Sequence, residues 1–70
     1  MRLSARNQIK GTVADIDRGP IHSKVRIDIG GGNRLTSVIS TEAVDELGLK
    51  VGAACIAVVK ASSVMVGVDH

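Results

Sequence analysis

The chain has 70 residues and a formal net charge of +2; 44% of its residues are hydrophobic and none is aromatic. We expect a single domain over residues 1–70, and so small a domain buries too little surface for more than marginal stability. The one cysteine, Cys55, excludes an internal disulfide, and no cysteine–histidine cluster offers a structural zinc site. Self-association is the remaining way to complete the core, so we expect a homo-oligomer.

We expect neither a secretory signal nor a membrane span. The apolar stretch from Val51 to Val59 is too short to cross a bilayer. The N-terminal residues MRLSARNQIK contain no apolar segment of the kind that a secretory signal needs. With the lone cysteine, these features predict a cytoplasmic protein that has no membrane partner.

The segment from Leu3 to Asp17 predicts a first strand, because β-branched residues recur along it. Gly11 interrupts this segment, which indicates a bulge or a bend of the kind that curves a small barrel. Gly19 and Pro20 then end the strand.

Residues 21–29 alternate strictly in polarity, which predicts a strand with one solvated face. One face is expected to carry Ile21, Ser23, Val25, Ile27 and Ile29, and the other His22, Lys24, Arg26 and Asp28. The glycine-rich residues 30–33 predict a hairpin turn, and residues 34–40 follow as its second strand.

After the hairpin the spacing of apolar residues changes from two, as in a strand, to three, since Val44 and Leu47 lie three positions apart. Residues 41–47 predict a short helix that Ser40 or Thr41 can cap and that Gly48 can end. Residues 53–60 are apolar on both faces, which predicts a fully buried strand. Residues 61–63 form a turn in this interpretation, and residues 64–68 form a last strand.

Five short strands with one helix between the third and the fourth are typical of the OB-fold. The predicted fold class is therefore all-β, a five-stranded OB-like barrel with one short helix between strands 3 and 4. The alternative is an SH3-like barrel, which would not need the helix.

Several classes of function are disfavoured by the side chains. An enzyme is not expected, because His22 lies on a polar strand face, His70 is the last residue and Cys55 belongs to an apolar strand. Nucleic acid is not an expected partner, since OB-folds stack bases on aromatic side chains and this chain has none. A metal cation would need clustered carboxylates or imidazoles, so neither a cation site nor a cofactor is predicted.

Three groups of hydrogen-bond donors remain, one near the start, one where the helix begins and one between the last two strands. Donors combined with fixed positive charge suit a small tetrahedral oxyanion. The three groups lie far apart in the sequence, so their convergence is an assumption. They consist of Ser4, Arg6, Asn7, Gln8 and Lys10; Ser40 and Thr41; and Lys60, Ser62 and Ser63.

The motif Ser4-Ala5-Arg6-Asn7-Gln8, with Gly11 after it, resembles the start of the molbindins, the small Mop-type molybdate-binding proteins. The resemblance continues through residues 29–33, 36–40, 42–44, 47–49, 51–52, 57–62 and 64–67, and includes the Lys60-Ala61-Ser62 corner. It implies an OB-like fold, a homohexamer built as a trimer of dimers, and molybdate or tungstate bound non-covalently at subunit interfaces. The implied role is cytoplasmic molybdenum storage. Without an accompanying effector domain we expect the stand-alone form; the alternative is a molybdate-sensing module that acts through a partner protein.

The resemblance also implies the site residues. Ser4 and Arg6 match the family's oxyanion-binding start, and the Lys60 corner opposes it with charge and backbone N–H groups. Ser40 stands where the family often has threonine, and His22 stands where asparagine is common. The expected oxyanion-binding residues are Ser4, Arg6, Asn7, Ser40, Thr41, Lys60, Ala61 and Ser62, with a possible second site at Gly19, Ile21 and His22.

Overall fold

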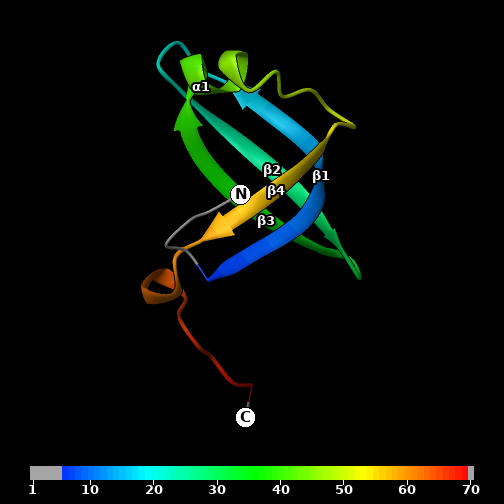
Figure 1. The fold of residues 1–70 in the computed structure, drawn as a ribbon, viewed down its shortest axis with the longest axis vertical. Helices are drawn as coiled ribbons and strands as arrows, with labels where there is room; N and C mark the ends of the chain where they lie inside the picture. Colours follow the sequence, from blue (N-terminus) through cyan, green and yellow to red (C-terminus); the bar gives the residue numbers. More distant parts are fainter. Residues whose placement is uncertain (1–5, 70) are drawn as a thin grey trace.

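The computed structural model describes residues 6–69, and within them four strands form one curved antiparallel sheet (Figure 1). The order across the sheet is β3-β2-β1-β4, so β3 and β4 are its two edges. One short helix connects β3 to β4, as predicted, and the mostly-β, OB-like fold class is confirmed. The elements are β1 (Asn7–Arg18), β2 (His22–Gly30), β3 (Asn33–Ser40), α1 (Thr41–Glu46), β4 (Ala54–Val59) and the 3-10 turn η1 (Ala61–Ser63).

Strand β2 shows the predicted alternation. Ser23, Val25 and Ile27 are buried, while the residues between them face outward. Ile21 departs from the prediction: it precedes the strand and is exposed. The hairpin to β3 closes through Gly31 and Gly32, which both have positive φ, as a two-residue type I′ turn requires.

Strand β1 curves because it must pair with β2 along one half and with β4 along the other (Figure 1). The register shift lies between Val13 and Asp15, so the bulge is not at Gly11 as predicted. Gly11 is needed for another reason. A Cβ there would lie 2.6 Å from Cγ2 of Ile27 and 2.7 Å from the carbonyl oxygen of Asp28, so only glycine lets the two strands approach this closely.

Helix α1 is capped at both ends by its sequence. The Ser40 hydroxyl accepts a hydrogen bond of 3.0 Å from the N–H of Ala43. At the other end, Gly48 has φ +63°, and the N–H groups of Leu49 and Gly48 bond to the carbonyls of Val44 and Asp45. This is a Schellman motif, and it turns the chain back so that Val44 is buried in the core.

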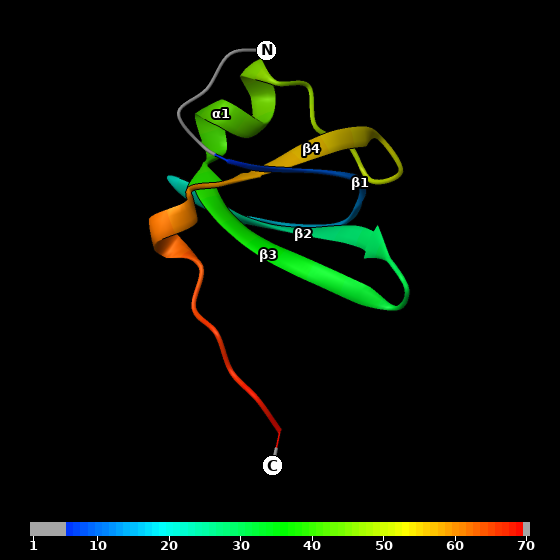
Figure 2. The ribbon, with the colours of Figure 1, turned by 60° about the horizontal axis from the view of Figure 1, so that its bottom comes forward.

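Two expectations about the C-terminal third are wrong. Strand β4 is not buried on both faces, because it lies at a sheet edge where Ile56 and Val58 stay exposed. Residues 64–68 form no strand in this chain: they leave the body after η1 and find no ladder partner (Figure 2). The described sheet therefore has four strands, since the fifth segment lacks a neighbour within its own chain.

The core is small. The buried hydrophobic side chains are Val13, Val25, Ile27, Val44 and Ala57. They come from β1, β2, β4 and α1, so the helix covers one end of the curved sheet. The chain exposes 5514 Å², whereas a compact chain of this mass exposes about 4,200 Å². Much apolar surface is thus left uncovered in a single chain.

Candidate functional site

The first and third groups of donors meet at the end of the β1–β4 pair. The ladder ends with Asn7 opposite Val59, so Arg6 and Lys60 are the next residues on the two strands. The Asn7 amide donates to the carbonyl oxygen of Val59 at 3.2 Å, which ties the two strands together at this end. Arg6 and Lys60 are both exposed. Two cations thus stand at one end of the sheet, which we call the cationic end.

Strand β4 leads at once into η1, which carries the other residues predicted for this end. Lys60 precedes η1 with extended backbone, and Ala61 and Ser62 belong to the turn. Ala61 and Ser62 are both exposed, and no side chain caps the turn. Ser4 lies outside the described residues. Hence Arg6, Asn7, Lys60, Ala61 and Ser62 are gathered within one short region of the fold.

The second group lies where β3 passes into α1. Ser40 faces outward and pairs with His22 across the β2–β3 ladder. The N–H of Thr41 donates to the carbonyl oxygen of Ile21 at 2.8 Å, so the Ile21–Thr41 pair is the hydrogen-bonded one. His22 and Ser40 are then a non-hydrogen-bonded pair, in which side chains lie closest. The Ser40 hydroxyl accepts from Ala43 and keeps its own hydrogen to donate.

The residues predicted for a second site are part of this same corner. Gly19 accepts a hydrogen bond of 2.7 Å from the Thr41 hydroxyl, and Ser23 lies 2.7 Å from that hydroxyl. The Gly19 N–H points back to the Ser23 hydroxyl at 3.4 Å. Gly19, Ile21, His22, Ser40 and Thr41 therefore form one region, which we call the hydroxyl corner. Ser23 was predicted only as an inward strand residue, because nothing in the sequence signals its bond to a residue 18 positions away.

The cationic end and the hydroxyl corner do not meet within one chain. Along the longest axis of the molecule, η1, which adjoins the cationic end, lies well below α1, which adjoins the hydroxyl corner (Figure 1). The sequence-based assumption that all donor groups converge is therefore not met inside a single chain.

Ion pairs occupy the outer faces of β1 and β2. Arg18 bonds to the Asp45 carboxylate at 2.9 and 3.0 Å, which fastens the end of β1 to α1. The hydrogen bond from Arg18 lowers the pKa of Asp45, and the same bond raises the pKa of Arg18. Arg26 pairs with Asp15 across the β1–β2 ladder. These cations are neutralised by partners, unlike Arg6 and Lys60, for which the described residues provide no ion pair.

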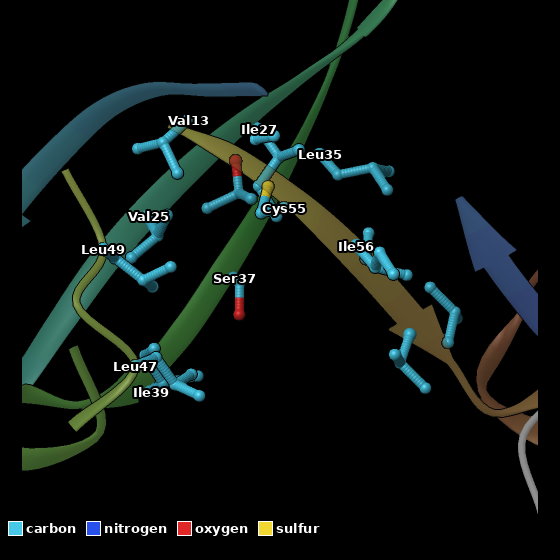
Figure 3. A pocket seen from close by; sticks show the side chains of 15 residues that line it. Val13, Val25, Ile27, Leu35, Ser37, Ile39, Leu47, Leu49, Cys55 and Ile56 are labelled. Carbon is cyan, nitrogen blue, oxygen red and sulfur yellow. The ribbon is translucent and has the colours of Figure 1, made fainter. Parts of the chain in front are cut away.

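An apolar hollow of about 560 Å³ opens between the two edge strands. It is lined by side chains of all four strands, most of them apolar, with Leu47 and Leu49 from the segment after α1 (Figure 3). Cys55 and Ser37 lie among these side chains (Figure 3). A smaller hollow of about 270 Å³ adjoins the hydroxyl corner, with His22, Lys24 and Arg18 on its lining.

Neither a metal-ion site nor a membrane-spanning helix is formed by the described residues. No group of three or more histidine, cysteine, aspartate or glutamate side chains in residues 6–69 is arranged to hold a metal ion. No helix formed by these residues is long and apolar enough to cross a membrane.

Comparison with known proteins gives matches over nearly the whole chain. The family model of the TOBE domain matches residues 3–66. A probable molybdenum-pterin-binding protein of Haemophilus influenzae is 55% identical over 69 residues, which is 99% of this chain and 100% of that protein.

Solved structures match equally well. MopII from Clostridium pasteurianum, in an apo form, superposes with a TM-score of 0.87 at 46% identity, covering 96% of this chain and 100% of that one. The cytoplasmic molybdate-binding protein ModG, solved with molybdate bound, gives a TM-score of 0.92 at 49% identity. That match covers 99% of this chain and 49% of ModG, so this chain spans about half of ModG's length.

Proposed function

We propose that this chain, which belongs to the TOBE domain family and within it to the Mop-type proteins (molbindins), binds molybdate, and tungstate as its near-isostere. The observation that carries the proposal is the cationic end. Arg6 and Lys60 stand on neighbouring strands, and the segments 6–10 and 58–63 contain no acidic residue. A dianion placed there would meet two positive charges without a competing carboxylate.

Binding in this proposal is non-covalent and leaves the oxyanion's coordination and oxidation state unchanged. Arg6 and Lys60 offset the charge of the dianion, while hydroxyl groups of Ser4, Ser40 and Ser62 and backbone N–H groups satisfy its oxygens. Charged groups bind an anion more strongly when water is partly excluded, because the lower dielectric strengthens each contact. A fixed ring of donors also favours one oxygen spacing, which would select molybdate over the smaller sulfate.

We further propose that the site is completed between subunits of a homo-oligomer, a hexamer built as a trimer of dimers as the family resemblance implies. Two observations support assembly. The cationic end and the hydroxyl corner lie apart in one chain (Figure 1). A second chain could place its own hydroxyl corner beside the cationic end of the first. The exposed area also exceeds that of a compact chain by roughly a third.

The C-terminal residues suggest how two chains would join. Met65 is 94% exposed and Val66 is 90% exposed, in a segment that points away from its own body (Figure 2). The hollow between β3 and β4 is apolar and is bounded by two unpaired strand edges. A segment with valines at positions 64, 66 and 68 fits such a hollow as an added strand, since alternate side chains of a strand share one face. We propose that each chain lends residues 64–68 to a second copy.

The physiological role that follows is storage or buffering of molybdenum in the cytoplasm. A reversible, non-covalent site releases its oxyanion unchanged, which suits a reservoir. No catalytic step is part of this proposal.

The proposal is tested by thermal unfolding in the presence of different oxyanions. Micromolar molybdate should raise the melting temperature, because a ligand that binds only the folded state stabilises it by mass action. Sulfate at the same concentration should have little effect. Equal shifts with both anions would contradict a molybdate site.

The site residues are tested separately. Arg6→Ala and Lys60→Ala should each remove most of the molybdate affinity while the oligomer stays intact, with Arg34→Ala as a matched control at the far end of β3. Native mass spectrometry with and without molybdate would report subunit number and ligand number together. Unchanged binding in both site variants would rule out the cationic end.

A further inference from the structure

Gly19, Ser23 and Thr41 form a hydrogen-bonded ring that closes through the backbone of Gly19. The Thr41 hydroxyl donates its only hydrogen to the carbonyl oxygen of Gly19 at 2.7 Å. The Ser23 hydroxyl, 2.7 Å from Thr41, must therefore be the donor of their shared bond. The N–H of Gly19 closes the ring by donating to Ser23. Neither hydroxyl has a hydrogen left for a ligand.

The ring joins the start of α1 to residues 19–23, which are about twenty positions earlier in the chain. Ser23 is only 2% exposed, so its hydroxyl is fixed in the interior of β2. Thr41 begins α1 directly after Ser40, and its N–H is bonded to Ile21 in the loop before β2. The loop is tightly folded on itself, because a Cβ at Gly19 would lie 2.3 Å from the carbonyl oxygen of His22. The ring thus determines where Ser40 lies relative to His22.

We propose that Ser23 and Thr41 are positioning residues for oxyanion binding: their hydroxyl ring holds Ser40 and the Gly19–His22 loop at a set spacing. The inference rests on the proposed function. It removes the Thr41 side chain from the direct oxyanion ligands that the sequence predicted. It also adds Ser23 to the residues that support binding, a role that the sequence did not predict. Ser40, whose hydroxyl accepts from Ala43 and keeps its own hydrogen, and His22 with its ring N–H remain the side chains of this corner that can donate to an oxyanion.

Two variants of Thr41 distinguish the effect of its hydroxyl on binding from the effect of its side-chain shape. Thr41→Val keeps the volume but breaks the ring, and Thr41→Ser keeps the ring but removes a methyl group. Isothermal titration with sodium molybdate, below the melting temperature of every variant, should show affinity about fivefold weaker for Thr41→Val, as loss of one hydrogen bond's free energy predicts. Thr41→Ser should recover affinity to within about twofold of the unchanged chain.

The partner residue provides a second test. Ser23→Ala should weaken binding as much as Thr41→Val, and the double variant should be no weaker than either, because one ring is broken in all three. Thr12→Val, the same chemical change at an exposed position of β1, is the control and should bind normally. Amide exchange at Ala43, whose N–H bonds to Ser40, should speed up in the ring variants alone.

The outcomes distinguish this inference from the proposed function. If the unchanged chain fails to bind molybdate, the proposed function falls and the positioning role falls with it. If the unchanged chain binds and Thr41→Val binds equally well, only the positioning role is overturned. Loss of affinity in Thr41→Ser equal to that in Thr41→Val would also overturn it, because the methyl group and not the ring would then matter.

Discussion

The hydroxyl corner and the apolar hollow differ in whether one chain can complete them. At the corner, the hydroxyls of Ser23 and Thr41 find their partners inside the same chain. At the hollow, two strand edges and a wall of apolar side chains face an opening of about 560 Å³. Folding of a single chain is thus enough to fix the polar geometry of the hydroxyl corner. Burial of the remaining apolar surface at the hollow requires assembly with other chains.

The strongest way to break this comparison is to prevent the hollow from being filled. Val66→Asp places a carboxylate on the face of residues 64–68 that we expect to enter a second copy. Burying an unpaired charge is very costly, so self-association should weaken by more than about a hundredfold. Size-exclusion chromatography with light scattering would measure the oligomer. The hydroxyl corner should be unaffected.

The matched control for this variant is Val51→Asp, an exposed valine in the turn before β4. It should leave the oligomer intact. An intact oligomer in Val66→Asp as well would show that residues 64–68 do not hold the subunits together.

A smaller effect is expected where the two halves of β1 meet. Gly11→Ala forces a Cβ against the Asp28 carbonyl and Ile27, and should lower the free energy of unfolding by about 1–3 kcal/mol. Chemical denaturation would measure it, with Thr12→Ser expected to change the value by less than about 0.5 kcal/mol. A Gly11→Ala variant as stable as the unchanged chain would mean that β1 and β2 can separate without cost.

The smallest effect is expected at the exposed ion pair beside the hydroxyl corner. Arg18 lowers the pKa of Asp45 in the folded chain, so the pair stabilises the fold above the ordinary aspartate pKa of 3.8. That contribution is lost as the pH falls through the lowered pKa. Asp45→Asn should reduce the melting temperature by a few degrees at most near pH 7.

The pH dependence is the sharper measurement for this pair. The melting temperatures of Asp45→Asn and the unchanged chain should converge as the solution is acidified below pH 3.8. A difference that persists in strong acid would assign the effect to packing of the helix and not to charge.

The sequence was sufficient for the parts of the fold that depend on neighbours along the chain. The alternation of β2, the Gly31–Gly32 turn and the Ser40 cap are all local, and each was predicted. The meeting of Arg6 with Lys60 was only assumed from the sequence, because it depends on the pairing of β1 with β4, two strands that are far apart along the chain.

The sequence was insufficient where a residue's environment depends on a distant segment. Apolar residues on both faces of β4 were interpreted as burial within one chain, although the strand lies at an edge. Residues 64–68 have the composition of a strand but no partner here. The Ser23–Thr41 bond depends on the register between β2 and β3, which a single sequence does not specify.

The turn η1 is only three residues long, and it connects Lys60 directly to the segment that begins at Val64. If that segment docks on a second copy and Lys60 holds an oxyanion, then occupancy and self-association are thermodynamically linked. Apparent affinity for the oxyanion would then rise with the concentration of the protein itself. Such a reservoir would fill when its chains are abundant and empty as they are diluted, with no separate regulator.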